Sequence, residues 1–380
     1  MKGAPLRTCP CGRAKENRGP KARQFVSAVG VVAVKRRYWQ CRCGAAGAYA
    51  ADDVLGLDGR FSKAVQKHCC RLAADVPFAA TGEHLREMLG VRLAPETARA
   101  LVQGHGRAMA AFQPRDETTA RAFRQAGGEV GFAADAGKVN TREAGREGLK
   151  IAVISKRQAA PPRAPAQWQE ERLPAATMVI AFAMIATAQV FRRSWRGTPR
   201  RPGVTAFAAV HALGDGAGWI RKAVDRALTG CTQTLDIYHA SERLSQCAQA
   251  IFGEGTAAAT AAFERGRHLL LHDGWPGVCA WVAELLSPPA GTDLAEVERR
   301  RPATDRLLRY FAKHVNRLGY RERLASGRAI GSGAVEGQAK TLGLRLKSRG
   351  ARWRMANVRP MASLICVRHS PQWDAYWSRN

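Results

Sequence analysis

The chain has 380 residues, 46% of them hydrophobic, and carries 60 Lys and Arg against 31 Asp and Glu, a formal net charge of +29 at pH 7. This length and apolar content predict a globular protein and exclude a chain without a core. The positive charge is scattered along the chain and indicates a polyanionic partner, for which we favour nucleic acid over an anionic membrane. The alternative is an arginine-rich proteome, which would also raise the arginine content.

Residues 175–191, "AATMVIAFAMIATAQVF", form the longest apolar stretch. Polar residues interrupt it and Arg192 and Arg193 follow directly, whereas a membrane-spanning helix needs about 20 apolar residues. Its β-branched residues predict a buried strand instead. The N-terminus lacks the apolar segment of a secretory signal. We therefore expect a cytoplasmic protein without a membrane partner, in which the cysteines do not form a disulfide framework.

Two matched cysteine pairs stand near the N-terminus, in "TCPCGR" (residues 8–13) and "QCRCGA" (residues 40–45). Each pair is followed by glycine, and a valine-rich segment with strand alternation separates them. Two knuckles joined by a hairpin would bring four thiolates to one tetrahedral Zn²⁺. The spacing is C-x-C rather than the usual C-x₂-C, so a metal-free ribbon is the alternative. The zinc ligands predicted on this basis are Cys9, Cys11, Cys41 and Cys43.

Residues 57–109 predict three or four short helices. Pro95 stands at a first helical position after a short turn in "GVRLAPETARAL", which is the rhythm of a helix-turn-helix. The final helix would direct Glu96, Thr97 and Arg99 toward a DNA major groove. A plain helical linker bundle is the alternative, and the neighbouring cationic residues favour DNA.

A series of strands begins near residue 126. "GGEVGFAADAGKVNT" predicts a strand that ends at Asp135, and "GLKIAVISKR" and "ATMVIAFAMIATAQV" predict two more, joined by a proline-rich loop over residues 158–174. Three consecutive strands indicate an antiparallel meander. Two strand-to-helix segments follow, "AVHALGDGAGWIRKAVDRAL" and "QTLDIYHASERLSQCAQAI". This element order is that of an RNase H-like fold.

The pattern over residues 241–330 is helical almost throughout, which predicts an all-helical insertion. In "AIGSGAVEGQAKTLGLRLKSRGARWR", a flexible Gly331-Ser332-Gly333 segment then precedes a helix with Glu336 in its opening turns. A glutamate in that position is also favourable against the helix dipole alone.

The predicted fold is therefore α/β: a small cysteine-knuckle β ribbon, a helical helix-turn-helix region, and an RNase H-like core interrupted by an all-helical insertion. The corresponding domains are residues 1–52 (zinc-ribbon-like head), 53–125 (helix-turn-helix region), 126–240 (first part of the core), 241–330 (insertion) and 331–380 (C-terminal helices of the core).

Three acids occupy equivalent kinds of position in this core. Asp135 and Asp215 each stand at the predicted end of a strand, and Glu336 opens a helix after the insertion. Carboxylates that converge at a sheet edge can hold two divalent cations about 3.5 to 4 Å apart for phosphodiester chemistry. Hard oxygen ligands favour Mg²⁺ or Mn²⁺.

Four runs carry a family resemblance: "ADAGKVNT", "GDGAGWI", "LDIYHASERL" and "IGSGAVEGQAKTLGLRLKSRGARW". In this order they resemble the DDE transposases of bacterial insertion sequences. The chain is most similar to the group with a cysteine-knuckle head, a helix-turn-helix, and an RNase H-like core with a helical insertion. The resemblance covers nearly the whole chain, and the motifs GDGAxWI, DxYHAxE and GSGxVE are specific in combination.

The resemblance implies that Asp135, Asp215 and Glu336 form the catalytic triad of acids. Asp135 would bridge both metals, and the other two acids would each complete one site, without a covalent protein intermediate. The partners implied are double-stranded DNA, namely the terminal inverted repeats of the mobile element and its target, and further copies of the chain in a dimer or larger assembly. The setting implied is the bacterial cytoplasm, in association with the nucleoid.

The resemblance also bears on Asp236 and His239. Many such transposases carry a carboxylate or cysteine shortly before a histidine that follows the second acid. Two interpretations stay open: Asp236 caps the helix that begins near His239 and the pair supports structure or DNA position, or His239 takes part in strand chemistry by contacting a phosphate or a flipped base.

Cations near the third acid are predicted to contact DNA phosphates, because they would follow it along one helix. The predicted DNA contacts are Lys340, Arg345, Lys347, Arg349, Arg352 and, in the helix-turn-helix region, Arg99. The chain departs from the family that it resembles in the tight cysteine pairs and in Ala136, where a glycine is common. Neither departure removes a predicted Mg²⁺ ligand.

Two alternatives to a transposase remain. One is an RNase H-like nuclease that cuts DNA without joining it, and the other is a transposase-derived DNA-binding regulator without catalytic activity. Loss of an acid would favour the regulator, but Asp135, Asp215 and Glu336 are all present.

Overall fold

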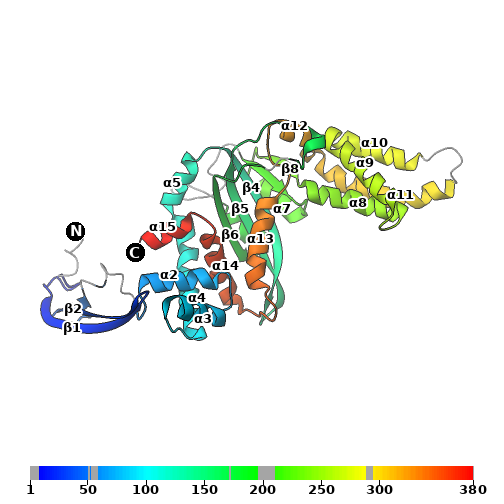
Figure 1. Cartoon of the computed structure of the whole chain (residues 1–380). Coiled ribbons are helices and arrows are strands. Elements are labelled where there is room, and N and C mark those ends of the chain that lie inside the picture. Colours follow the sequence, from blue (N-terminus) through cyan, green and yellow to red (C-terminus); the bar gives the residue numbers. More distant parts are fainter. Residues whose placement is uncertain are drawn as a thin grey trace. The chain divides into compact units, whose positions relative to one another are not determined.

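The structure, a computed structural model, describes residues 8–49, 52, 59–170, 173–195, 210–287 and 294–379. Contacts divide the chain into two compact units (Figure 1). The first comprises Met1–Phe112 and Leu344–Asn380, and the second comprises Gln113–Gly343. Among the described residues, no helix combines the length and the apolarity needed to cross a membrane.

A three-stranded antiparallel sheet opens the first unit. Its strands, in the order β1-β2-β3, are β1 (Glu16–Ser27), β2 (Gly30–Gln40) and β3 (Ala48–Tyr49). Ser27 pairs with Gly30 across a tight turn, and Gly30 adopts a φ of 110° that favours glycine. The strand alternation between the two cysteine pairs therefore does correspond to a hairpin.

Three helices follow in the first unit: α2 (Lys63–Ala73), α3 (Phe78–Leu89) and α4 (Pro95–Phe112). Gly90 ends α3 in the left-handed conformation, with φ 64°, and residues 90–94 connect it to α4. Helix α4 begins at Pro95, as the sequence predicts. The three helices pack against one another.

The C-terminal segment belongs to the first unit, where it forms α14 (Met355–Arg368) and α15 (Gln372–Ser378). Helix α14 packs along α4. The approach is close enough that a Cβ on Gly106 would lie 2.3 Å from the backbone oxygen of Pro360. The five-part domain division remains a prediction, and contacts alone group these helices with the N-terminal segment.

The second unit is built on a mixed five-stranded sheet with the order β6-β5-β4-β7-β8. Strands β4, β5 and β6 form the expected antiparallel meander, while β7 pairs parallel to β4 and β8 parallel to β7. The bounds are β4 (Glu129–Thr141), β5 (Gly145–Arg157), β6 (Met178–Ile185), β7 (His211–Gly214) and β8 (Thr232–Leu235).

One face of this sheet carries the core of the unit. Phe132, on β4, packs in a cluster with Trp195, Ile220 and Val224. The helices that contribute to the cluster are α5 (Glu117–Gln125), α6 (Ala188–Arg193) and α7 (Gly218–Ala227). Because side chains alternate along a strand, Ala133 and Asp135 point to the opposite face.

A helical segment with its own core follows β8 (Figure 1). Trp281, Phe311 and Tyr320 are fully buried there. Its helices are α8 (Ile237–Phe252), α9 (Ala257–Asp273), α10 (Trp275–Leu286), α11 (Leu294–Phe311) and α12 (Tyr320–Ala325), and it contains the 3₁₀ turn η5 (Ala312–Arg317). Two further 3₁₀ turns, η2 (Gln113–Arg115) and η3 (Pro165–Gln167), come earlier in the chain. Helix α13 (Gly333–Leu346) follows α12 along the chain. The helical pattern beyond residue 240 is thus confirmed for the described residues.

Candidate functional site

The strand register brings Asp135 and Asp215 to equivalent positions on neighbouring strands. The β4–β7 ladder pairs Gly131 with His211 and Ala133 with Leu213, and each aspartate follows two residues later on its strand. Parallel strands lie about 4.8 Å apart, so the ladder continued by two residues sets the two aspartates side by side. Asp215 stands just past the end of β7, as expected. Asp135 lies inside β4 rather than at its end, because the β4–β5 hairpin continues beyond the rest of the sheet.

The same ladder extends to a third aspartate. Strands β7 and β8 pair through Gly214 and Leu235, so Asp236 is the counterpart of Asp215 on the next strand. The backbone N–H of Asp236 donates to the carbonyl of Gly214 at 2.8 Å. Three neighbouring strands therefore each present an aspartate at the same level of the sheet.

Asp135, Asp215 and Glu336 line one pocket of about 310 Å³ in the second unit. Glu336 reaches it from the first turn of α13, far along the chain from the strands. The remaining lining residues are Ala134, Tyr238, His239, Glu242, Ser332 and Val335. The structure thus brings together the three acids that the sequence singled out.

Hydrogen bonds hold each of these carboxylates. Asp135 Oδ1 accepts from the backbone N–H of Ala136 at 2.6 Å, and Asp215 Oδ1 accepts from that of Ala217 at 2.8 Å. Glu336 Oε1 accepts from the hydroxyl of Ser332 at 3.0 Å. The acids are therefore oriented by the backbone and by the start of α13.

The charges in the pocket act on one another. Burial raises the pKa of Asp135, and the negative charges of Asp215 and Glu336 raise it further against the hydrogen bond from Ala136. The pKa of His239 is raised by its hydrogen bond to Asp236 and by the surrounding acids, against the effect of burial. Crowded carboxylates of this kind favour a bound cation, which would offset their repulsion.

Asp236 sits behind the pocket and is fully buried. It caps α8, because its Oδ1 accepts from the backbone N–H of His239 at 3.0 Å, and the same oxygen lies 3.2 Å from His239 Nδ1. The cap expected from the sequence is therefore present. Ligand atoms of Asp236, His239 and Glu336 lie within 4.8 Å of one another and could bind a metal ion.

The predicted DNA contacts occupy different surroundings. Lys340, on α13, is exposed, and Lys347, Arg349 and Arg352 are exposed in the connection from α13 to α14 rather than along one helix. Arg99 is half-buried and bonds to Glu96 and Gln103 on its own helix. Lys340 and the cations of the connection thus lie at the surface.

Arg345 does not fit the prediction of a phosphate contact, because its side chain is only 5% exposed. Its Nε donates to the carbonyl of Ala73 at 2.8 Å. The guanidinium lies between two rings, 4.9 Å from the centroid of Phe78 and 5.0 Å from that of Trp353. Arg345 packs the helices of the first unit, and a sequence cannot distinguish this use of arginine from an exposed one.

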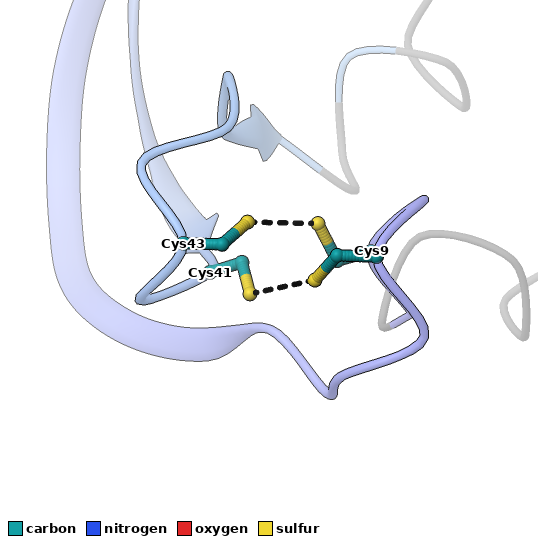
Figure 2. A group of neighbouring side chains, drawn as sticks. Cys9, Cys41 and Cys43 are labelled. Atoms are coloured by element: carbon teal, nitrogen blue, oxygen red, sulfur yellow. Dashed lines mark hydrogen bonds between the residues drawn. The ribbon is translucent and has the colours of Figure 1, made fainter.

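The four N-terminal cysteines form a compact cluster in the first unit (Figure 2). The sulfur atoms of Cys9 and Cys43 lie 3.4 Å apart, and those of Cys11 and Cys41 lie 3.6 Å apart. In a tetrahedron with Zn–S bonds of about 2.3 Å, neighbouring sulfurs are roughly 3.8 Å apart. The cluster could therefore bind zinc with little rearrangement.

Glycine makes the tight C-x-C spacing possible. Gly12 and Gly44, each directly after a pair, adopt φ values of 83° and 81°. Their backbone N–H groups donate to the carbonyls of Cys9 and Cys41, at 2.9 and 3.3 Å. Each knuckle is closed by a left-handed glycine, so both thiols of a pair turn to the same side.

The cluster favours one thiolate before any metal binds. A hydrogen bond from the backbone of Ala45, together with those from the neighbouring thiols, lowers the pKa of Cys43 to about 6. A hydrogen bond from the backbone of Arg13 lowers the pKa of Cys11, but the thiols around it raise it to about 12. A thiolate is the form that ligates zinc.

Ser332 lines the pocket and was not singled out by the sequence. The Gly331-Ser332-Gly333 segment suggests a flexible link, yet Ser332 is 3% exposed and precedes α13. Its backbone carbonyl accepts from the N–H groups of Val335 and Glu336, at 2.9 and 3.3 Å. The available signal was a serine at a helix start four residues before a glutamate, which is close to a capping box.

The chain was compared with models of known protein families and with curated proteins, and neither comparison found a match.

Proposed function

We propose that the chain is a transposase of a bacterial insertion sequence, which binds the terminal inverted repeats of its element and cuts and joins DNA. The observation that carries this proposal is the pocket lined by Asp135, Asp215 and Glu336. Two aspartates at one level of a mixed sheet meet there with a glutamate from the first turn of α13. Such an arrangement suits phosphodiester chemistry with divalent cations.

The sheet supports an RNase H-like core as the finer description of the fold. In sequence order its five strands are an antiparallel meander and two further parallel strands, and in space they lie in the order β6-β5-β4-β7-β8. A long helical segment then separates β8 from α13. This agrees with a catalytic core interrupted between its second and third acids.

The donor set fits Mg²⁺ or Mn²⁺, because these ions prefer carboxylate oxygen and the pKa of Asp135 is raised by burial and by its acidic neighbours. Asp135, Asp215 and Glu336 would hold the ions. When bound, a pair of such cations activates the attacking oxygen and stabilises the leaving oxygen. His239 carries a raised pKa beside the acids, and its protonated ring can donate to a DNA phosphate at the pocket.

The first unit supports recognition of the element ends. Helices α3 and α4 are joined by a short turn in the manner of a helix-turn-helix, and Arg99 lies in the first turns of α4. The β1–β2 hairpin carries exposed Lys35 and Arg37, and the cysteine cluster would bind Zn²⁺. Because two ends must be held together, we expect a dimer or larger assembly on DNA.

Strand cleavage and joining on a labelled duplex that bears the element ends, with Mg²⁺ or Mn²⁺, tests the proposal. We expect the wild type to cut and then join, and Asp215→Asn to bind the duplex without cutting. Asp305→Asn is the matched control, because Asp305 is exposed on α11 and lies outside the pocket.

The other outcomes separate the alternatives. Cutting without joining would identify an RNase H-like nuclease. Tight binding without cutting under either metal would identify a DNA-binding regulator and refute the enzyme.

A further inference from the structure

The start of α13 is attached to the start of α8 by two hydrogen bonds. The backbone N–H of Ile237 donates to the carbonyl of Ile330 at 3.1 Å, and the backbone N–H of Ser332 donates to Asp236 Oδ2. The two helix N-termini are therefore fixed side by side at the pocket, although the whole helical segment separates them in sequence.

Asp236 is placed to act through its neighbours. It is fully buried and absent from the lining of the pocket. Both of its oxygens already accept hydrogen bonds, Oδ1 from His239 and Oδ2 from Ser332. A buried carboxylate with this many donors holds them in fixed positions.

Ser332 connects Asp236 to the third acid. Its backbone N–H is held by Asp236, and its hydroxyl donates to Glu336 Oε1 at 3.0 Å. The segment lies close to the start of α8, since a Cβ added at Gly331 would be 3.0 Å from the ring of Tyr238. The carboxylate of Glu336 thus takes its position from a buried aspartate on another element.

We propose that Asp236 and Ser332 are positioning residues that set Glu336 for metal binding, with Asp236 also orienting His239. The inference rests on the proposed function, since it assigns how the metal-binding acid is held. Hydrogen bonds to a ligating carboxylate of this kind typically contribute 10-fold or more to metal affinity.

We call the hydrogen-bonded chain from Asp236 through Ser332 to Glu336 the relay. Mn²⁺ binding to the full-length protein, measured as the loss of the paramagnetic resonance signal of free Mn²⁺, tests the relay without relying on activity. Ser332→Ala removes the hydroxyl that holds Glu336, and we expect it to raise the Mn²⁺ dissociation constant about 10-fold. Ser332→Thr keeps a hydroxyl and should restore most of the affinity. Thr341→Ala is the matched control, because its hydroxyl lies on the same helix and donates to the carbonyl of Gly337.

Cleavage of the end duplex provides the second measurement. For Ser332→Ala we expect the Mn²⁺ concentration at half-maximal rate to rise by the same factor, while the rate at saturating Mn²⁺ and the melting temperature stay near wild type. Asp236→Asn should shift the Mn²⁺ dependence in the same direction. The double variant should add little to the larger single effect, because both residues act through one chain of bonds.

The outcomes separate the relay from the proposed function. If the wild type binds Mn²⁺ and cleaves while Ser332→Ala matches it, the relay is refuted and the transposase stands. An equal loss in Thr341→Ala would also refute the relay, because it would show general damage to α13. If the wild type neither binds Mn²⁺ nor cleaves, the proposed function fails and the relay fails with it.

Discussion

His211 is a buried histidine that the proposed chemistry does not use. It lies on β7, with Nδ1 2.7 Å from the hydroxyl of Thr232 and Nε2 3.0 Å from that of Thr234. Burial lowers its pKa to about 4, and the charge of Arg323 adds to this effect while Glu129 opposes it. His211 is therefore neutral in the folded protein at pH values where an unfolded histidine takes up a proton.

This difference predicts how stability depends on pH. The folded-state pKa is below the unfolded value of about 6.5, so the unfolded state binds more protons between pH 6.5 and 4 and the free energy of unfolding falls as the pH is lowered. The contribution from His211 is up to about 3 kcal/mol over this interval. Denaturant unfolding at several pH values should show a shallower fall in His211→Gln than in the wild type. An unchanged slope in His211→Gln would contradict the assignment.

At this scale the sequence identified the acids but not what holds them. Asp135, Asp215 and Glu336 stand out in the sequence because each ends a predicted strand or begins a predicted helix, and they do share one pocket, although β4 continues past Asp135. Ser332 was missed because its two glycine neighbours suggested flexibility, whereas a buried partner on another element fixes it. A hydrogen bond between segments distant in sequence leaves no local pattern.

At the scale of elements, the packing of α14 on α4 depends on one glycine. A Cβ on Gly106 would lie 2.3 Å from the carbonyl oxygen of Pro360, while a Cβ on Gly104, one half-turn away on α4, would meet no atom within 4 Å. The two glycines therefore allow a matched comparison, because an added Cβ would meet the backbone of α14 at Gly106 but not at Gly104.

Gly106→Ala and Gly104→Ala should have opposite effects on stability. Gly106→Ala forces α14 away from α4 and should lower the free energy of unfolding by about 1–3 kcal/mol. Gly104→Ala adds only helix propensity and should raise it by up to about 1 kcal/mol. Thermal unfolding of the two variants measures both effects. Equal effects would show that the close contact between α4 and α14 is not maintained.

The cysteine hairpin is the second element with a direct test. If the four sulfurs hold zinc, the purified chain should contain one zinc per molecule by elemental analysis, and Cys41→Ser should contain almost none. Affinity for the end duplex should fall in that variant, because the hairpin loses its anchor. Cys279→Ser is the control, since Cys279 is exposed on α10 and lies outside the cluster. Zinc retained by Cys41→Ser would exclude the site.

The sequence predicts which helices and strands form better than it predicts the residues at which they begin and end. Strand alternation predicted the antiparallel meander, and the preference of proline for the first helical position predicted the helix that begins at Pro95. The sequence does not predict the continuation of β4 to Thr141, because "GKVNT" is largely polar and pairs with the start of β5. Val139 and Thr141 are buried in that extension, and neither the pairing nor this burial is encoded in one strand by itself.

At the scale of the whole molecule, the grouping of the C-terminal helices with the N-terminal segment was beyond prediction. Helix α14 is an apolar helix that any face of the protein could cover, and only its contact with α4 decides the unit to which it belongs. Arg345 shows the same limit, since its burial between Phe78 and Trp353 depends on packing within that unit.

The net charge of +29 makes a prediction about binding as a whole. A protein that contacts six to ten phosphates loses about 10³–10⁵ in affinity between 50 and 200 mM salt, with a slope of log K against log salt near −0.9 per phosphate. We expect a slope of this size for the end duplex. Arg349→Gln, in the exposed connection before α14, should make the slope shallower by about 0.9, whereas Arg301→Gln should not, because Arg301 bonds to Glu298 on α11. A slope near zero would mean that the basic surface is not used for DNA, and an equal change in both variants would mean that charge acts without regard to position.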